Sequence, residues 1–448
     1  MKTIRTIILI ALPLMAAFLA QRGMQFIDTL MMGWIGPTAL AAGALGTSIF
    51  SAIVLFCMGA LSAVGILISR AKGADNLGDI TYHMQHGCYF ALLLSIPCML
   101  IIWFMPEFLL KLGQNSLVVT DTILLLKGMI WGFPGILLFL VFREFISVFS
   151  FTYVIMFVSL IAMPLTFLFN YILIYGKFHF PQLGIEGIGY SSAIVMWFMF
   201  LSLFIYSKIN PVLKGHVVLT PFKWNREIFR DMLHIGVPSG ILFLLEAGMF
   251  LSTNLIMGYF GIEALAAHQI AMQCVNIIYT FPIALSVATA LQIAHATGTR
   301  NIEHVKHIAF ISFSLVLFIS AVGACVFILA SHYLVIPFLE KGSKHFSSVY
   351  QLAVSFLKIA ALFLGFDGLQ SVVNGALRGL KDTFIPMILS VGCYWVLGVG
   401  TAYYLSMFTS LGPKGVWYGL SIGLGSTAVI LVLRFYRKSR RLSLDLGN

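Results

Sequence analysis

Three carboxylic acids interrupt stretches of the chain that are otherwise apolar enough to lie in a membrane. Asp28, Glu246 and Asp367 each fall inside a run that is long enough, at about 20 residues, to cross a bilayer. A charged side chain at the centre of a membrane helix costs about 3 kcal/mol, so such groups usually face a water-filled cavity or a partner. An ionised carboxylate can coordinate Na⁺, and a buried one holds a proton more tightly because desolvation disfavours its charge. We therefore expect these acids to bind a cation or a proton, and the sequence leaves both ions open.

Polar side chains accompany the acids at spacings that place them on one face of a helix. Gln21, Gln25 and Asp28 follow one another at such intervals, and comparable stripes surround Glu246 and follow Asp367. We expect these faces to line a substrate cavity between two lobes, and the residues assigned to it are Gln21, Arg22, Gln25, Met249, Phe250, Gln269, Gln273, Asn276, Gln370 and Asn374. The alternative is that the polar stripes only form hydrogen bonds between helices and hold the fold together.

Arg22 is the fourth charged group inside an apolar stretch. It precedes Asp28 by six residues, which is about 240° around a helix, so the two side chains do not face each other. The guanidinium could form an ion pair with Glu246 or Asp367, or it could extend toward the membrane surface. The sequence leaves these two interpretations open.

The elements that must position these residues are membrane helices. The chain has 448 residues, of which 60% are apolar and only 10% are charged, whereas a soluble domain carries about 25% charged residues. Its mean hydropathy is +0.98. The net charge of +11 is typical of basic loops on one side of a membrane, so we expect a lipid bilayer and no nucleic acid among the partners. The six cysteines have no metal-ligand spacing, and we expect no cofactor.

The apolar runs predict an all-α polytopic membrane protein with twelve transmembrane helices in two pseudo-symmetric six-helix lobes. The predicted spans are Ile7–Trp34, Leu40–Ser69, Gly87–Met105, Thr122–Phe142, Phe151–Tyr175, Ile185–Tyr206, Met232–Tyr259, Ala264–Thr297, Ile308–Ser331, Leu352–Leu377, Phe384–Met407 and Val416–Arg434. The N-terminal lobe comprises residues 1–206, a cytoplasmic linker residues 207–230, the C-terminal lobe residues 231–435, and a basic cytoplasmic tail residues 436–448.

An internal duplication relates the two halves. When the chain is shifted by 225 residues, residues 13–76 align with residues 238–301 without a gap, and 20 of these 64 positions are identical. Pro13 pairs with Pro238 and Gly23 with Gly248. In so apolar a composition, chance gives roughly one match in ten. Duplication inside a polytopic membrane protein is the usual construction of a secondary transporter.

The distribution of basic residues predicts the orientation of the chain. Most of the 27 Lys and Arg residues, Arg143 among them, are assigned to the two termini and to the loops after even-numbered spans. Positive residues accumulate on the cytoplasmic side of a membrane, so we expect both termini in the cytoplasm. With six spans per half, the two halves are parallel repeats related by an axis along the membrane normal.

Five short segments carry a resemblance to a known family. They read Gln25-Phe-Ile-Asp-Thr29, Asn170-Tyr-Ile-Leu-Ile-Tyr-Gly-Lys-Phe178, Leu245-Glu-Ala-Gly248, Ala266-Ala-His-Gln269 and Leu377-Arg-Gly-Leu-Lys-Asp-Thr383. Together with the twelve spans and the duplication, they make the chain resemble the multidrug and toxic compound extrusion (MATE) family, in its bacterial NorM-like branch. The resemblance covers about residues 7–435.

The resemblance implies drug export driven by Na⁺ or protons. It implies that Glu246 and Asp367 form a cation site in the C-terminal lobe, with Na⁺ as the possible metal, and that Asp28 and Asn170 form a site in the N-terminal lobe. The chain departs from the family pattern at three places. Thr166 stands where relatives often carry an asparagine, Arg22 stands where a small or neutral residue is usual, and the usual Gly and Pro after Arg143 are missing.

From these observations we expect a secondary active antiporter that exports cationic lipophilic compounds in exchange for Na⁺ or H⁺, works as a monomer and lies in a bacterial inner membrane. The alternative within the same superfamily is a flippase for a lipid-linked precursor, although three buried acids and twelve spans favour drug export. The chain has no G-x-x-x-x-G-K-[ST], H-E-x-x-H or G-x-S-x-G motif, and none of its loops clusters catalytic residues, so we do not expect an enzyme. A passive channel would not respond steeply to an ion gradient.

Overall fold

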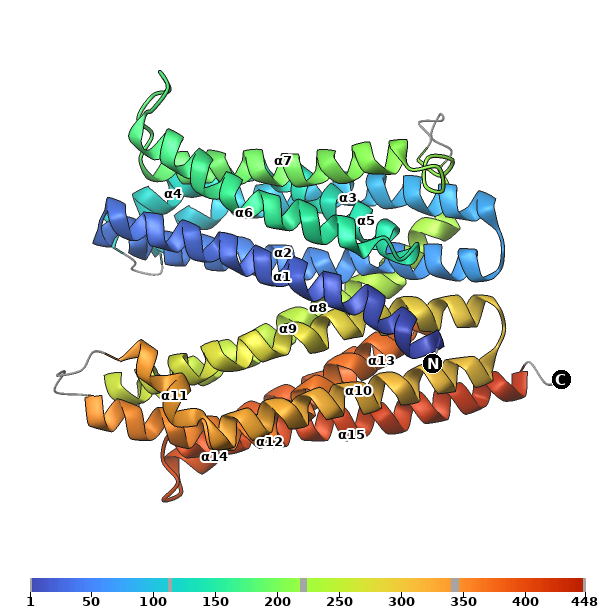
Figure 1. Cartoon of the computed structure of the whole chain (residues 1–448). Coiled ribbons are helices and arrows are strands. Elements are labelled where there is room, and N and C mark those ends of the chain that lie inside the picture. The colour runs from blue at the N-terminus through green and yellow to red at the C-terminus, as the bar shows by residue number, and fades with distance from the viewer. Residues whose placement is uncertain (1, 112–114, 218–223, 340–345, 446–448) are drawn as a thin grey trace. The chain divides into compact units, whose positions relative to one another are not determined.

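The computed structural model describes residues 2–111, 115–217, 224–339 and 346–445, and every regular element in these ranges is a helix. Long helices lie side by side within each part of the chain (Figure 1). The elements are α1 (Lys2–Ile35), α2 (Pro37–Gly73), α3 (Leu77–Lys111), α4 (Ser116–Ile130), α5 (Phe133–Val148), α6 (Thr152–Tyr175), α7 (Ile185–Ile209), α8 (Arg226–Gly258), α9 (Ile262–Gly298), α10 (Ile302–Leu329), α11 (Ser331–Val335), η1 (Ile336–Phe338), α12 (Phe346–Gly379), α13 (Phe384–Val391), η2 (Gly392–Gly400), α14 (Thr401–Met407) and α15 (Lys414–Asp445).

The described residues contain eleven helical spans that are long and apolar enough to cross a membrane, and twelve when one bent pair of helices is taken as a single span. This confirms the predicted all-α polytopic fold. The bent pair is α4 and α5, whose axes differ by 50°, and it replaces the straight fourth span that the sequence predicts. Gly132 precedes α5 and Pro134 lies in its first turn. Proline favours the start of a helix over its interior, so the chain bends here and begins a new helix.

The chain forms two compact units. The N unit is Leu12–Gly240, and the C unit is Met1–Ala11 together with Ile241–Asn448. Both boundaries fall inside a long helix, close to Pro13 of α1 or Pro238 of α8, which are the prolines that the duplication pairs. A proline removes one helical hydrogen bond and crowds the preceding turn, so each helix passes from one unit to the other where it is weakened. The lobes predicted at residues 1–206 and 231–435 stay a prediction.

Most helices are longer than the spans predicted for them, because hydropathy marks only their apolar middles. Helix α3 begins at Leu77, ten residues before the predicted start. Helix α8 begins at Arg226, inside the predicted linker, and residues 218–223 of that linker lie outside the described residues. Helix α15 continues to Asp445 through the predicted tail. Polar turns at these ends extend the helices beyond the length that an apolar run alone supports.

The assignment of Arg143 to a cytoplasmic loop is wrong. The residue lies inside α5 and is only 2% exposed. Its Nη2 lies 2.9 Å from Oε1 of the neighbouring Glu144, which is buried as well. A buried charge needs a partner to offset its desolvation, and the adjacent acid supplies one. The cytoplasmic placement of the two termini stays a prediction.

A π-helix interrupts the predicted eleventh span. Residues Gly392–Gly400 form this segment, η2, between α13 and α14. Gly398 of η2 lies so close to Gly423 of α15 that a Cβ on Gly423 would stand 2.5 Å from the Gly398 Cα. Segments of π-helix are rare and occur frequently at functional sites. Two facing glycines therefore allow α15 to pack directly on an unusual backbone segment.

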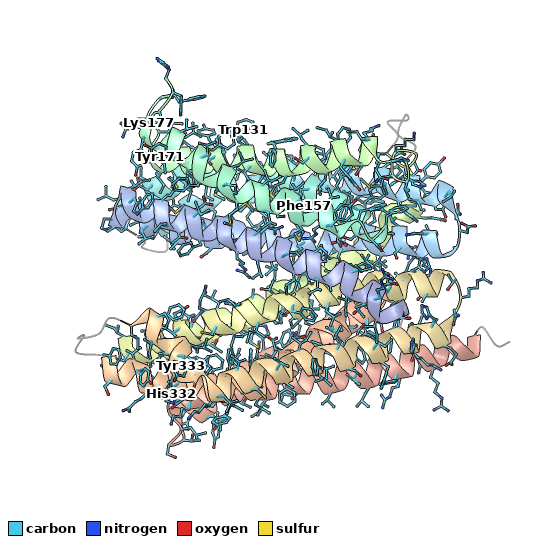
Figure 2. The ribbon with its side chains drawn as sticks, in the orientation of Figure 1. Trp131, Phe157, Tyr171, Lys177, His332 and Tyr333 are labelled. Carbon is cyan, nitrogen blue, oxygen red and sulfur yellow. The ribbon has the colours of Figure 1, made fainter. Side chains whose placement is uncertain are left out.

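Large aromatic side chains are exposed on both units. Trp131, Phe157 and Tyr171 of the N unit are 63%, 55% and 40% exposed, and Tyr333 of the C unit is 77% exposed. Figure 2 shows Trp131, Tyr171 and Lys177 toward the same end of the N unit, with Phe157 nearer its middle. Tryptophan, tyrosine and lysine gather where a membrane meets water, whereas phenylalanine tolerates the hydrocarbon. The exposed surface of the N unit thus has the composition of a membrane-embedded one.

Candidate functional site

Four segments of the C unit bring together two acids, two tyrosines and an amide. Glu246 comes from α8, Tyr279 from α9, Asp367 and Gln370 from α12, and Tyr394 from η2. The Oε1 of Glu246 accepts two hydrogen bonds, from Tyr279 Oη at 2.9 Å and from Gln370 Nε2 at 3.1 Å. Gln370 Nε2 also lies 3.5 Å from Asp367 Oδ1. The two acids that the sequence singled out in this half therefore share one amide donor.

The other end of the Gln370 amide is held by two donors. Its Oε1 accepts a hydrogen bond from Tyr394 Oη at 2.7 Å and another from Asn374 Nδ2 at 3.0 Å. Asn374 follows Gln370 by one helical turn, so the two side chains lie above one another on the same face of α12. Both ends of the Gln370 amide are thus engaged.

Apolar packing encloses this network. Asp367 is 1% exposed, and Gln370 and Tyr394 are fully buried. The core around them includes Leu242, Met249, Phe363, Leu364 and Leu424. Polar groups cut off from water are costly unless they find hydrogen-bond partners. Two carboxylates with one shared amide donor leave excess negative charge in an apolar setting, and a cation or a proton can offset it.

The side chains of the network fit a sodium ion as cargo. Carboxylate, hydroxyl and carbonyl oxygens bind such hard cations, and Glu246, Asp367 and Tyr279 supply oxygens of the first two kinds. A proton fits equally well, because a protonated carboxyl group can donate a hydrogen bond to its neighbour. The donor set alone is compatible with either coupling ion.

In the N unit, Asp28 of α1 and Asn170 of α6 are in direct contact. Asn170 Nδ2 donates a hydrogen bond to Asp28 Oδ1 at 2.7 Å. Asn170 is fully buried, and its Oδ1 has no hydrogen-bond partner among the described residues. Thr166 lies one turn before Asn170, and its hydroxyl donates to the Ala162 carbonyl of the same helix at 2.9 Å. The departure at Thr166 therefore replaces a side chain that could face Asp28 with one bonded to its own backbone.

The remaining polar residues assigned to a cavity in the N unit lie on α1. Arg22 and Gln25 are exposed. Gln21 is partly buried, and its Nε2 has no hydrogen-bond partner within the described ranges. Asp28 is partly buried on the same helix. These positions remain candidates for substrate contact.

The candidate cavity residues of the C unit are spread over three helices. Gln370 and Asn374 belong to the buried network on α12. Gln269 Nε2 donates to Asn254 Oδ1 at 2.9 Å. Other candidates differ in exposure: Gln273 and Asn276 are exposed on α9, Phe250 is partly buried and packs edge-on against Phe363, and Met249 is fully buried in the apolar core.

Sequence reasoning missed both tyrosines of the network. Tyr279 and Tyr394 are single tyrosines in apolar runs, where a tyrosine is as common at a lipid-facing position as inside a bundle. The π-helix adds to the difficulty for Tyr394, because a pattern of 3.6 residues per turn does not describe η2. A usable signal was present for Tyr279, which lies three residues after Asn276 on a stripe already singled out.

Comparison with known proteins identifies the family. The family model described as MatE matches residues 13–172 and 238–404. The chain belongs to the MatE family. The two matched segments begin at Pro13 and Pro238, as the duplication does. Membership confirms the resemblance seen in the sequence, and it confirms a transporter instead of an enzyme.

Relatives of this MatE protein extend over nearly the whole chain. The chain is 32% identical over 440 residues to a probable multidrug resistance protein NorM from Pseudomonas putida, covering 98% of this chain and 95% of the relative. It is 34% identical to a probable multidrug resistance protein NorM from Pseudomonas aeruginosa, covering 98% and 90% respectively. This MatE protein is therefore a multi-pass membrane protein homologous to bacterial NorM.

Solved MatE-type structures share the fold. A crystal structure of MATE in the bent conformation matches with a TM-score of 0.89 and 19% identity over the full length of both chains. An outward-facing structure of a multidrug resistance MATE family transporter matches with a TM-score of 0.88 and 20% identity, covering 98% of this chain and 96% of the other. At this level of identity the match establishes the fold.

Proposed function

We propose that this MatE protein is a secondary antiporter that exports cationic, lipophilic drugs or toxic compounds in exchange for Na⁺ or protons. The observation that carries the proposal is the pair Glu246 and Asp367, which share the Gln370 amide in an apolar core. Acids at such positions in membrane proteins are usually part of ion or proton pathways. The names of the bacterial relatives, which describe multidrug resistance, support export as the direction.

The arrangement supports exchange because the same carboxylate charge attracts both transported species, the coupling ion and the cationic drug. When a cation or proton binds at Glu246 and Asp367, the local negative charge falls, and a positively charged drug is held less strongly. When the ion leaves, the negative charge returns and favours the drug again. A ligand shifts a conformational equilibrium only if it binds the two conformations with different affinity. The change of charge at Glu246 and Asp367 gives the drug such a difference in affinity.

The contact between Asp28 and Asn170 supports a second ion-sensitive site in the N unit. The hydrogen-bond donors differ between the two sites. Asp28 accepts from one amide at 2.7 Å, whereas Glu246 accepts from an amide and a tyrosine. We propose that Asp28 also changes its charge during the cycle. Candidate substrate contacts within the N unit are the exposed polar residues Arg22 and Gln25, and those within the C unit are Gln269, Gln273 and Asn276.

The proposal is tested by efflux of ethidium from proteoliposomes, with a sodium gradient and a proton gradient imposed separately. Export should follow one of the two gradients. It should be lost in Glu246→Gln and Asp367→Asn, which keep the shape of the side chain and remove its charge. Glu303→Gln serves as a matched control, because Glu303 pairs with Lys306 at the surface and its side chain is 85% exposed.

Full ethidium export by both amide variants would overturn the proposal. Failure of folded wild-type protein to respond to either gradient would favour the lipid-linked flippase, and flipping of a lipid-linked sugar would then be measured in the same vesicles.

We also propose that the protein is a monomer in a bacterial inner membrane, with both termini in the cytoplasm. The exposed aromatic side chains and the bacterial relatives support the membrane assignment. Labelling of single cysteines near the two ends by a membrane-impermeant thiol reagent in intact cells tests the orientation, since both should be protected.

A further inference from the structure

The Gln370 side chain has a defined orientation because its two ends meet opposite kinds of partner. Carboxylate oxygens of Glu246 and Asp367 lie at 3.1 and 3.5 Å from its nitrogen. The hydroxyl of Tyr394 and the amide nitrogen of Asn374 lie at 2.7 and 3.0 Å from its oxygen. An ionised carboxylate only accepts hydrogen bonds. A half-turn of the amide would therefore place its oxygen against two acceptors.

In this orientation, the Gln370 atom next to the two acids is one that cannot bind a metal cation. The Nε2 of Gln370 carries two hydrogens and no lone pair to offer, so it cannot ligate Na⁺. It also lies within hydrogen-bonding distance of both carboxylates, at the place where a cation would gain most from them. In this position the amide nitrogen acts as a tethered, partly positive substitute for the ion. A sodium ion has to displace it.

We propose that Gln370 is the gate of the ion site and that Tyr394 and Asn374 hold it closed; the inference rests on the proposed ion coupling at Glu246 and Asp367. Entry of Na⁺ requires the Gln370 amide to turn, which brings its Oε1 toward the cation as a ligand. Turning breaks the two hydrogen bonds that Oε1 now accepts. Tyr394 and Asn374 therefore set the cost of admitting Na⁺, and with it the discrimination against that ion.

The open orientation has an acceptor available to it. The Oδ1 of Asn374 is buried and has no hydrogen-bond partner among the described residues. When the Asn374 amide turns together with that of Gln370, this oxygen can accept from the displaced Gln370 Nε2. The displaced Gln370 nitrogen therefore keeps a hydrogen-bond partner in the open orientation, whereas the bond that Tyr394 donates is lost.

The position of Tyr394 on η2 couples the gate to the helices that pack around it. Tyr394 is fully buried, and its 2.7 Å hydrogen bond ties the π-helical segment to α12. Turning of Gln370 breaks that tie. The occupancy of the ion site is thereby communicated to η2 and to α15, which packs on η2 through Gly423 and Gly398.

Binding of radiolabelled Na⁺ to the purified, detergent-solubilised protein at alkaline pH tests the gate without any transport step. Tyr394→Phe keeps the ring and removes one of the two hydrogen bonds to Gln370 Oε1. We expect this variant to bind Na⁺ about tenfold more tightly than the wild type, since one weakened restraint of about 1.4 kcal/mol corresponds to that factor. Tyr403→Phe is the matched control, because Tyr403 lies on the adjoining α14 and is 49% exposed.

A double-mutant cycle separates a gate from a general loosening of the core. Gln370→Met removes the amide and keeps the length of the side chain, so Tyr394 no longer has a gate to restrain. In that background Tyr394→Phe should have no further effect. Thermal unfolding of each variant verifies that it is folded.

Equal Na⁺ affinity in the wild type and Tyr394→Phe would overturn the gate, as would additive effects of the two substitutions. Absence of Na⁺ binding in every variant would overturn it too, because an opened gate must admit the ion. The proposed antiport is tested separately, by the dependence of efflux on an ion gradient and by the loss of efflux in Glu246→Gln.

Discussion

Arg378 lies over the aromatic ring of Phe243, with its guanidinium carbon 5.5 Å from the ring centroid. The N unit contains the same contact, because Arg143 lies over Phe18 at 5.5 Å. Phe18 and Phe243 are equivalent positions of the duplication, 225 residues apart. Each unit therefore holds a helix that begins a repeat, α1 or α8, against a later helix, α5 or α12, by a cation–π contact. The duplication has preserved an interaction as well as a sequence pattern.

Replacing either phenylalanine by leucine should destabilise the protein. A desolvated cation–π contact contributes on the order of 1 to 2 kcal/mol, so Phe18→Leu and Phe243→Leu should each lower the midpoint of thermal unfolding in detergent. Phe157→Leu is the control, because Phe157 is a phenylalanine on α6 that is 55% exposed (Figure 2). Equal unfolding midpoints for all three variants would show that the arginines contribute nothing through these rings.

Replacing one member of the buried pair Arg143–Glu144 should lower the stability more than replacing both. Removal of one partner leaves an uncompensated buried charge, so Arg143→Met should lower stability by about 3 to 5 kcal/mol. The double variant Arg143→Met/Glu144→Leu should recover most of that loss, because no charge is left behind. At the surface pair Lys306–Glu303, Lys306→Met should cost about 0 to 1 kcal/mol. A double variant as unstable as Arg143→Met would mean that the arginine acts through packing alone.

The sequence predicted the acids well because membranes make charge expensive. Asp28, Glu246 and Asp367 stood out against apolar surroundings, and helical periodicity then placed Gln370 and Asn374 on the face of Asp367. The same reasoning failed for Arg143. A basic residue near the end of an apolar run was assigned to a loop, and only the structure shows that Glu144 neutralises it inside α5.

The pairings between helices could not be predicted from one sequence. The distance of 2.7 Å between Asp28 and Asn170 joins residues 142 positions apart, and no periodicity encodes such a contact. Tyr394 was hidden for a different reason, since its backbone follows a π-helical path. Gly132 and Pro134 indicated the bend between α4 and α5, but a hydropathy average over a whole span does not register two such residues.

Asn170 should matter for transport whereas Thr166 should not. Asn170→Leu removes the amide that donates to Asp28, so the Asp28 carboxylate loses a hydrogen bond on which its charged form depends. We expect a severalfold loss of gradient-driven ethidium efflux. Thr166→Val should leave efflux unchanged, since within the described part of the chain the Thr166 hydroxyl donates only to the Ala162 carbonyl of its own helix. The reverse ranking of the two variants would refute a role for the Asp28–Asn170 contact.

His216 should make stability depend on acid. It lies beyond α7, where its ring stacks on Phe149 at 5.7 Å and its Nδ1 lies 3.3 Å from Thr81 Oγ1. Burial lowers the pKa of His216 below its ordinary 6.5, because desolvation disfavours the charged ring. The unfolded chain therefore binds the proton more readily than the folded one, and stability falls as pH drops through 6.5.

The corresponding measurement is the unfolding midpoint of wild type and His216→Phe between neutral and mildly acidic pH. The difference between them should change with pH in that window and level off above it. A constant difference would show that protonation of His216 does not favour the unfolded state.

Gly423 should tolerate no side chain, because α15 packs directly on η2. A Cβ at Gly423 would stand 2.5 Å from the Cα of Gly398 and 3.1 Å from the Cys393 carbonyl oxygen. Both are backbone atoms, so no side-chain rotation relieves the overlap, and Gly423→Ala should cost about 1 to 3 kcal/mol, as overpacking does. Gly365→Ala is the matched control, since a Cβ at Gly365 of α12 meets nothing within 4 Å. There the better helix propensity of alanine should raise stability by up to about 1 kcal/mol. Opposite shifts of the two unfolding midpoints would establish that the π-helical segment is held by a glycine contact, and a stable Gly423→Ala would show that α15 can retreat from it.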